Sequence, residues 1–228
     1  MEISALIMAG GKGTRLRPYT DKTPKPLLKI DEKPLIDYVI DYLNKAKIKD
    51  IFVAVNNEKE KIKKHLKNMD VRIIETDGPI AYATIQAARV IESPFLSVPS
   101  DVIQEPGTIV RLYESFKKAN CSAMHHYSKE SIVENSIVSY QEFKELINKS
   151  AKTGNNFFRT ASIYSPNELL SIEKQITAST DGAATLLSET LENAGHKVKC
   201  LITSKKYVSI NTPEDLINAS REISSIVK

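Results

Sequence analysis

The stretch LIMAGGKGTRLRPYTDKTPKPLLKI, residues 6–30, decides how this sequence folds. A short apolar run leads directly into three closely spaced glycines, which are followed by several cations and by two prolines that flank Lys25. Glycine lets the backbone approach a ligand closely and tolerates positive φ. The cations indicate that this ligand is anionic, and the apolar run before the glycines is typical of a buried strand.

Outward from this stretch, short apolar runs alternate with amphipathic segments. Strands are predicted at residues 3–9, 50–55, 71–76, 94–101, 158–164 and 197–203. Helices are predicted at residues 34–48, 60–69, 81–91, 107–120 and 180–195. Alternating strands and helices indicate βαβ units and a mainly parallel sheet. We therefore expect a single α/β domain over residues 1–228.

Residues 121–158 interrupt this alternation. The segment NSIVSYQEFKELINKSAKTGNN has weak periodicity and ends with the turn residues Gly154, Asn155 and Asn156. This pattern predicts an inserted hairpin or flap over approximately residues 121–158.

Composition excludes several classes of protein. A net charge of +4, with 41% hydrophobic and 26% charged residues, is ordinary for a globular protein and gives no basic, aromatic-interleaved stripe for nucleic acid. Cys121 and Cys200 are far apart, and His125 and His126 are the only adjacent histidines, so a zinc site or disulfide framework is unsupported. No segment reaches the roughly 18 apolar residues that span a membrane. We expect a cytoplasmic protein with neither membrane nor nucleic-acid partners.

The glycine loop fails the two common phosphate-loop patterns. A Walker A loop needs Ser or Thr after its lysine, but Gly13 follows Lys12, and Leu6 stands where the first glycine belongs. In the dinucleotide pattern, Leu16 would occupy the third glycine position.

The arrangement GGxGTRLRPxT followed by PKP, from Gly10 to Pro26, resembles the signature of the nucleotidyltransferase superfamily that makes nucleotide sugars. The resemblance covers most of the chain and implies a Rossmann-like, three-layer fold with a mixed, mainly parallel sheet and a flap over the acceptor. It also implies transfer of a nucleoside monophosphate from a nucleoside triphosphate to a phosphorylated acceptor, most simply a sugar 1-phosphate. Because the chain stops one helix after TPEDL, the β-helix of some bifunctional relatives is not expected.

By this resemblance, the catalytic residues are Arg15, Lys25 and Asp101. Arg15 presents a planar fork of donors to the β and γ phosphates, and Lys25 places a compact charge at the α-phosphate. The attacking phosphate is already ionised, so no general base is needed. The resemblance also assigns nucleotide contacts to Ala9, Gly10, Gly11, Lys12, Gly13, Thr14, Asp77, Gly78 and Ser100, and acceptor contacts to Ser162 and Asn211.

The segment PFLSVPSDVI resembles the family strand that ends in a metal-binding aspartate, which places Mg²⁺ at Asp101. The closing segment YVSINTPEDL departs from the family, because Ser209 stands where a second metal carboxylate is usual. The metal site is then one negative charge short, which leaves open a catalytically weakened nucleotide-binding protein.

Selectivity is the least determined property. Asp77 is a candidate hydrogen-bond acceptor for the N1 and N2 hydrogens of guanine, and this interpretation favours GTP. Alternatively, Asp77 is an ordinary turn residue before Gly78. Members of the family usually have a Leu-Gly-Thr-Ala element near the base and often a Glu-Lys-Pro element that faces the sugar. This sequence has TDGPIAYATI and NKSAKTG in their places. The chain also resembles the archaeal cobinamide-phosphate guanylyltransferase, so cobinamide phosphate remains an alternative acceptor.

Overall fold

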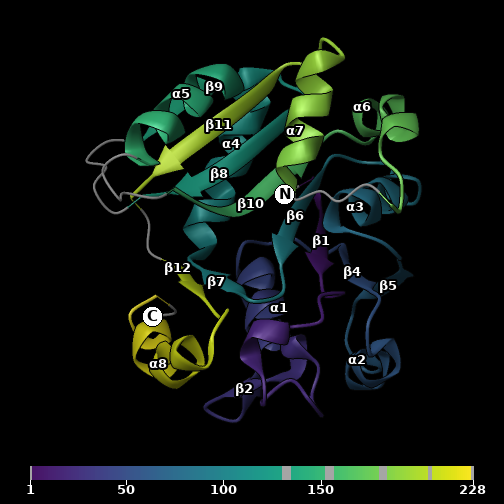
Figure 1. The fold of residues 1–228 in the computed structure, drawn as a ribbon, viewed down its shortest axis with the longest axis vertical. Helices are drawn as coiled ribbons and strands as arrows, with labels where there is room; N and C mark the ends of the chain where they lie inside the picture. The colour runs from purple at the N-terminus through teal and green to yellow at the C-terminus, as the bar shows by residue number, and fades with distance from the viewer. Residues whose placement is uncertain (1, 130–134, 152–156, 180–183, 205–206, 227–228) are drawn as a thin grey trace.

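A computed structural model of the chain describes residues 2–129, 135–151, 157–179, 184–204 and 207–226. Its centre is an eight-stranded sheet with the order β5-β4-β1-β6-β10-β8-β11-β9 (Figure 1). These strands are β1 (Ser4–Met8), β4 (Ile51–Val55), β5 (Arg72–Glu75), β6 (Phe95–Pro99), β8 (Ala123–Ser128), β9 (Ser136–Ser139), β10 (Phe158–Tyr164) and β11 (Val198–Thr203). Strands β5, β4, β1 and β6 run parallel, as do β8 and β11, whereas β10 runs antiparallel to both of its neighbours. The expected mixed, mainly parallel sheet is confirmed.

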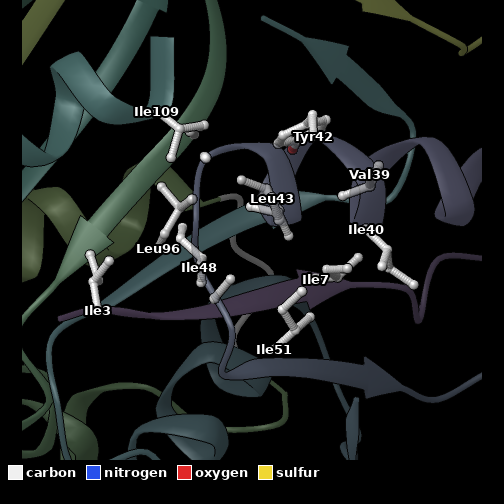
Figure 2. Packing of buried hydrophobic residues seen from close by; sticks show 14 of the residues in the cluster. Ile3, Ile7, Val39, Ile40, Tyr42, Leu43, Ile48, Ile51, Leu96 and Ile109 are labelled. Carbon is white, nitrogen blue, oxygen red and sulfur yellow. The ribbon is translucent and has the colours of Figure 1, made fainter. Parts of the chain in front are cut away.

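Helices cover both faces of the sheet because successive strand residues point to opposite sides. Ile7 of β1 packs in a cluster with α1 and α4, whereas its neighbour Leu6 packs in a second cluster with α3, α6 and α7. Figure 2 shows the first cluster, in which Ile7 and Ile51 lie opposite Val39 of α1. The helices are α1 (Leu35–Lys45), α2 (Lys59–Leu66), α3 (Ile80–Ala88), α4 (Pro106–Ala119), α5 (Tyr140–Ala151), α6 (Pro166–Ser171), α7 (Ala184–Asn193) and α8 (Pro213–Ser224).

The segment expected to form a flap belongs largely to the sheet. Strand β8 is buried along its whole length between β10 and β11, so the expectation of a flap is wrong for this part. Strand β9 forms the sheet edge against β11 and leads directly into α5, whose Phe143 is fully buried. The polar residues between the apolar positions concealed this packing in the sequence. The predicted turn at Gly154, Asn155 and Asn156 lies outside the described residues.

A smaller layer lies beside the carboxyl end of β6. The short strands β7 (Val102–Gln104) and β12 (Tyr207–Ser209) pair antiparallel, and α8 packs next to them (Figure 1). A third apolar cluster joins this layer to the glycine-loop segment through Leu16 and Ile103. Helix α8 begins with a capping box in which Thr212 and Asp215 exchange hydrogen bonds. The cationic loop is therefore held against the closing segment by apolar packing.

The helices in the described ranges are all too short or too polar to cross a membrane.

Candidate active site

A cavity of about 760 Å³ opens where several strands of the sheet end. In open α/β sheets this edge is the usual place for ligands. Segments that are distant in sequence line it: the glycine loop, the ends of β4 and β5, the turn after β6, the start of β10, and Ser209 with Asn211. Its lining residues include Met8, Gly10, Gly11, Lys12, Gly13, Thr14, Arg15, Lys25, Asn56, Asn57, Thr76, Gly78, Ser97, Ser100, Asp101, Arg159, Thr160, Ser162, Tyr164, Ser209 and Asn211.

Glycine is required at two positions of the loop. A Cβ on Gly10 would lie 2.9 Å from the Cβ of Asn56, which is closer than side-chain atoms approach. Gly13 has a φ of 64°, and a Cβ there would lie 2.9 Å from Thr20 and 3.1 Å from the Cβ of Lys25. The Gly10 carbonyl accepts a 2.5 Å hydrogen bond from Nδ2 of Asn57. The loop thus lies tightly against both the strand β4 end and the lysine.

Lys25 and Asp101 form an ion pair at the centre of the cavity. Their side chains are only 13% and 15% exposed, so water screens this pair weakly. Lys25 also donates to Oδ1 of Asn211 at 3.3 Å, and Nη2 of Arg15 donates to the same oxygen at 2.8 Å. Asn211 therefore holds Arg15 and Lys25 together beside Asp101.

Ser209 lies next to this cluster. It pairs with Val102, the residue after Asp101, in the β12–β7 ladder, and the Ile210 amide donates to the Asp101 carbonyl at 3.0 Å. The Ser209 hydroxyl accepts a 2.6 Å hydrogen bond from Nδ2 of Asn211. Ser209 thus lies beside Asp101, at the position where the family usually has a second metal carboxylate, but it offers only a neutral hydroxyl.

The β10 end of the cavity has a different character. Arg159 donates through Nε to Ser162 at 2.9 Å and through Nη2 to the Tyr164 hydroxyl at 2.9 Å. Nη2 also contacts Nδ1 of His125, whose pKa is lowered well below its usual value by burial and by the charge of Arg159. Thr160 contacts Nδ1 of His126, and burial lowers the pKa of His126 to about 4. Both histidines are therefore neutral near pH 7.

The sequence profile of the nucleotidyl transferase family matches residues 4–224. The chain belongs to the nucleotidyl transferase family. Among its relatives, the bifunctional protein GlmU of Methanococcus aeolicus is 27% identical over 99% of this chain and 56% of that protein. The mannose-1-phosphate guanyltransferase of Schizosaccharomyces pombe is 33% identical over 62% of this chain and 46% of that enzyme. The chain thus spans about half the length of these curated relatives.

Solved structures agree with this family fold. The inositol-1-phosphate CTP transferase from T. maritima superposes with a TM-score of 0.78 at 18% identity, covering 99% of this chain and 96% of that one. A UDP-glucose pyrophosphorylase complexed with UDP-glucose gives a TM-score of 0.72 at 17% identity over 99% of both chains. At such identities the superpositions establish the fold alone.

Most residues that the sequence assigns to the site of this nucleotidyl transferase lie on one cavity. The residues that line it are Gly10, Gly11, Lys12, Gly13, Thr14, Arg15, Lys25, Gly78, Ser100, Asp101, Ser162 and Asn211. Ala9 is buried and does not line it. Asp77 does not line it either, and Nε2 of Gln86 donates to its carboxylate at 2.6 Å. This hydrogen bond favours the turn interpretation of Asp77 over recognition of guanine.

Several lining residues were not anticipated from the sequence. Asn56, Asn57 and Thr76 directly follow β4 and β5, and the rule that ligands bind beyond strand ends could have identified them. Arg159 offered no such signal, since FRTASIY resembles any half-buried strand. Its place in the cavity depends on the antiparallel pairing of β10 with β6.

Asp101 is the only cavity residue assigned to a metal. Within the described parts of the chain, no group of three or more His, Cys, Asp or Glu side chains is arranged to hold a metal ion. Mg²⁺ commonly uses one or two carboxylates and completes its shell with substrate phosphates and water. The donor set of Asp101 with the neighbouring Ser209 hydroxyl therefore fits Mg²⁺ only together with a bound triphosphate.

Proposed function

We propose that this chain is a Mg²⁺-dependent sugar-1-phosphate nucleotidyltransferase. It transfers a nucleoside monophosphate from a nucleoside triphosphate to the phosphate of a sugar 1-phosphate and releases pyrophosphate. The observation that carries this proposal is the convergence of Arg15, Lys25 and Asp101 around Asn211 in one cavity. Similarity to relatives such as the mannose-1-phosphate guanyltransferase of Schizosaccharomyces pombe supports a phosphorylated sugar as acceptor.

Each residue has a role that follows from its chemistry. An acceptor phosphate oxygen attacks the α-phosphorus in line, and the bond from that phosphorus to the β-phosphate oxygen breaks. Lys25 stabilises the charge that develops on the α-phosphate, and Arg15 orients the leaving pyrophosphate. Asp101, assisted by Ser209, would hold Mg²⁺, which neutralises phosphate charge. In this chemistry the main-chain amides of residues 10–14 would approach phosphate oxygens.

The Lys25–Asp101 ion pair fits this division of roles. An ammonium and a carboxylate that are both largely shielded from water attract each other strongly and hold each other in place. Asn211 accepts hydrogen bonds from Lys25 and Arg15 and so orients both side chains. Because its amide is neutral, it does not offset the positive charge of Arg15. The cations thus remain available to phosphates, which is what transition-state stabilisation of phosphoryl transfer requires.

A pyrophosphate-release screen tests the proposal. The common nucleoside triphosphates are combined with a panel of hexose 1-phosphates and with cobinamide phosphate, in the presence of Mg²⁺. We expect one sugar 1-phosphate to give the highest kcat/KM. The highest value with cobinamide phosphate would replace the acceptor, and background rates in every combination would favour a nucleotide-binding protein without turnover.

A further inference from the structure

Arg159 is a cation in the cavity that the nucleotidyl-transfer chemistry above does not use. It lies at the start of β10, away from the glycine loop in sequence, and lines the same cavity as Ser162 and Tyr164. Its guanidinium is held in place by hydrogen bonds to Ser162, Tyr164 and His125. Nη1 is shielded from solvent and has no hydrogen-bond partner among the described residues.

Among the described residues, the groups that contact this guanidinium are neutral. His125 must accept from Arg159, which can only donate, and its Nε2 contacts the Ser188 hydroxyl at 2.8 Å. Burial raises the pKa of Tyr140 and of the Cys200 thiol to about 12, and it raises the pKa of Tyr127 as well. These groups therefore stay protonated near pH 7. In the parts of the chain that are described, no carboxylate forms an ion pair with Arg159.

A cation that is shielded from water without a counter-ion is costly for a folded protein. The cost is offset when a ligand supplies the missing charge, and perturbed or unpaired charged groups therefore concentrate at binding sites. Arginine is also suited to such a role, because its planar fork matches the oxygens of carboxylates and phosphates.

We propose that Arg159 is a specificity-determining residue that binds an oxyanion of the acceptor and selects against cationic acceptors. This inference rests on the proposed function, since it takes the β10 end of the cavity to be the acceptor end. The oxyanion has two possible sources, the acceptor phosphate itself or a second acidic group on the acceptor. Choline phosphate is disfavoured with either source, because its quaternary ammonium either takes the place of the second acidic group or lies only two carbons from the phosphate that Arg159 would bind.

Calorimetric binding to the full chain, without nucleotide, separates these sources. The probes are glucose 1-phosphate, glucuronic acid 1-phosphate and choline phosphate. Arg159→Met removes the charge while keeping most of the side-chain length, and Arg159→Lys keeps the charge without the fork. Arg111→Met is the matched control, because Arg111 is exposed on α4, which covers the opposite face of the sheet.

We expect Arg159→Met to weaken binding of a sugar phosphate by about 10- to 100-fold, as for loss of a charged hydrogen bond. Arg159→Lys should lose less, and Arg111→Met should bind as the wild type does. Equal losses for both sugar phosphates would identify the phosphate as the oxyanion, and a loss confined to glucuronic acid 1-phosphate would identify the second acidic group. Unchanged binding of both, tightest wild-type binding of choline phosphate, or no wild-type binding of either sugar phosphate would overturn the proposal.

Two further measurements keep the result interpretable. Thermal unfolding should show that the sugar phosphate stabilises the wild type and Arg111→Met more than Arg159→Met, which a merely structural role would not produce. If Arg159→Met does not fold, Arg159→Lys carries the binding test. In the enzyme assay, the Arg159 variants could turn over substrate with an unchanged KM for the acceptor. This result would refute the role of Arg159 and leave the proposed function intact. Arg159-dependent binding without turnover would instead refute the proposed function alone.

Discussion

The two ends of the cavity differ in the groups that surround their cations. At the glycine-loop end, Arg15 and Lys25 both donate to Asn211, and Lys25 also forms an ion pair with Asp101. At the β10 end, Arg159 is surrounded by the neutral side chains of His125, Ser162 and Tyr164. In the proposed reaction, the first end faces charge that changes at the α-phosphate, whereas the second faces a ligand charge that stays constant.

The largest effect is expected at Lys25. Lys25→Ala removes the charge that faces the α-phosphate and leaves Asp101 without its partner, so kcat/KM should fall by about 100- to 1000-fold. Lys22→Ala is the matched control, since Lys22 is an exposed lysine of the same loop. Steady-state kinetics with saturating Mg²⁺ measures both. Near-normal turnover of Lys25→Ala would show that the phosphate assignment is wrong.

Arg15 should follow with a loss of about 100-fold in kcat/KM, because it contacts the leaving phosphates in the proposed chemistry. Arg17→Ala provides the control, since the Arg17 side chain is 70% exposed and its nearest charge is Asp21 at 3.4 Å. Product inhibition by pyrophosphate adds a second readout. It should weaken in Arg15→Ala and not in Arg17→Ala, and equal behaviour of the two variants would remove Arg15 from the site.

The contrast between the two ends also explains how much the sequence could predict. Gly13 is required by its positive φ, a local property of the backbone that leaves a readable pattern, whereas Gly10 is required by its contact with Asn56 after the neighbouring strand β4. The alternation of strands and helices likewise predicted the sheet, because side-chain periodicity is local. The neutral shell of Arg159 is assembled from β8, β10 and α7, and such long-range juxtaposition has no linear signal. In β8, polar residues between the apolar positions conceal a fully buried strand, so the sequence predicts part of a flap there.

Acid should affect the β10 end more than the glycine-loop end. The pKa of His126 is about 4 in the folded chain and near 6.5 in the unfolded chain. Between pH 4 and pH 6.5, the unfolded state therefore binds more protons than the folded state. Neutral His126 makes its full contribution to the free energy of unfolding above pH 6.5. This contribution, about 3 kcal/mol, is lost as the pH falls from 6.5 to 4.

Urea unfolding of the wild type and His126→Gln at several pH values from 7.5 to about 4.5 isolates this residue. Glutamine is neutral throughout and can still exchange hydrogen bonds with Thr160 and Thr203. We expect the wild type to lose more stability than the variant as the pH is lowered. Parallel losses in the two proteins would mean that His126 titrates normally in the fold.

The smallest effect is expected at Ser209, where the metal requirement of the glycine-loop end can be sharpened. A second carboxylate beside Asp101 would add one negative charge for a hard cation, whereas serine offers only a neutral hydroxyl. Ser209→Asp should therefore lower the Mg²⁺ concentration that gives half-maximal rate by a few-fold, and Asp101→Ala should abolish most activity. Ser209→Asn is the matched control, because it has the shape of aspartate without the charge. Rates measured against Mg²⁺ concentration decide the matter: an unmoved midpoint in Ser209→Asp together with an active Asp101→Ala would place the metal elsewhere in the cavity.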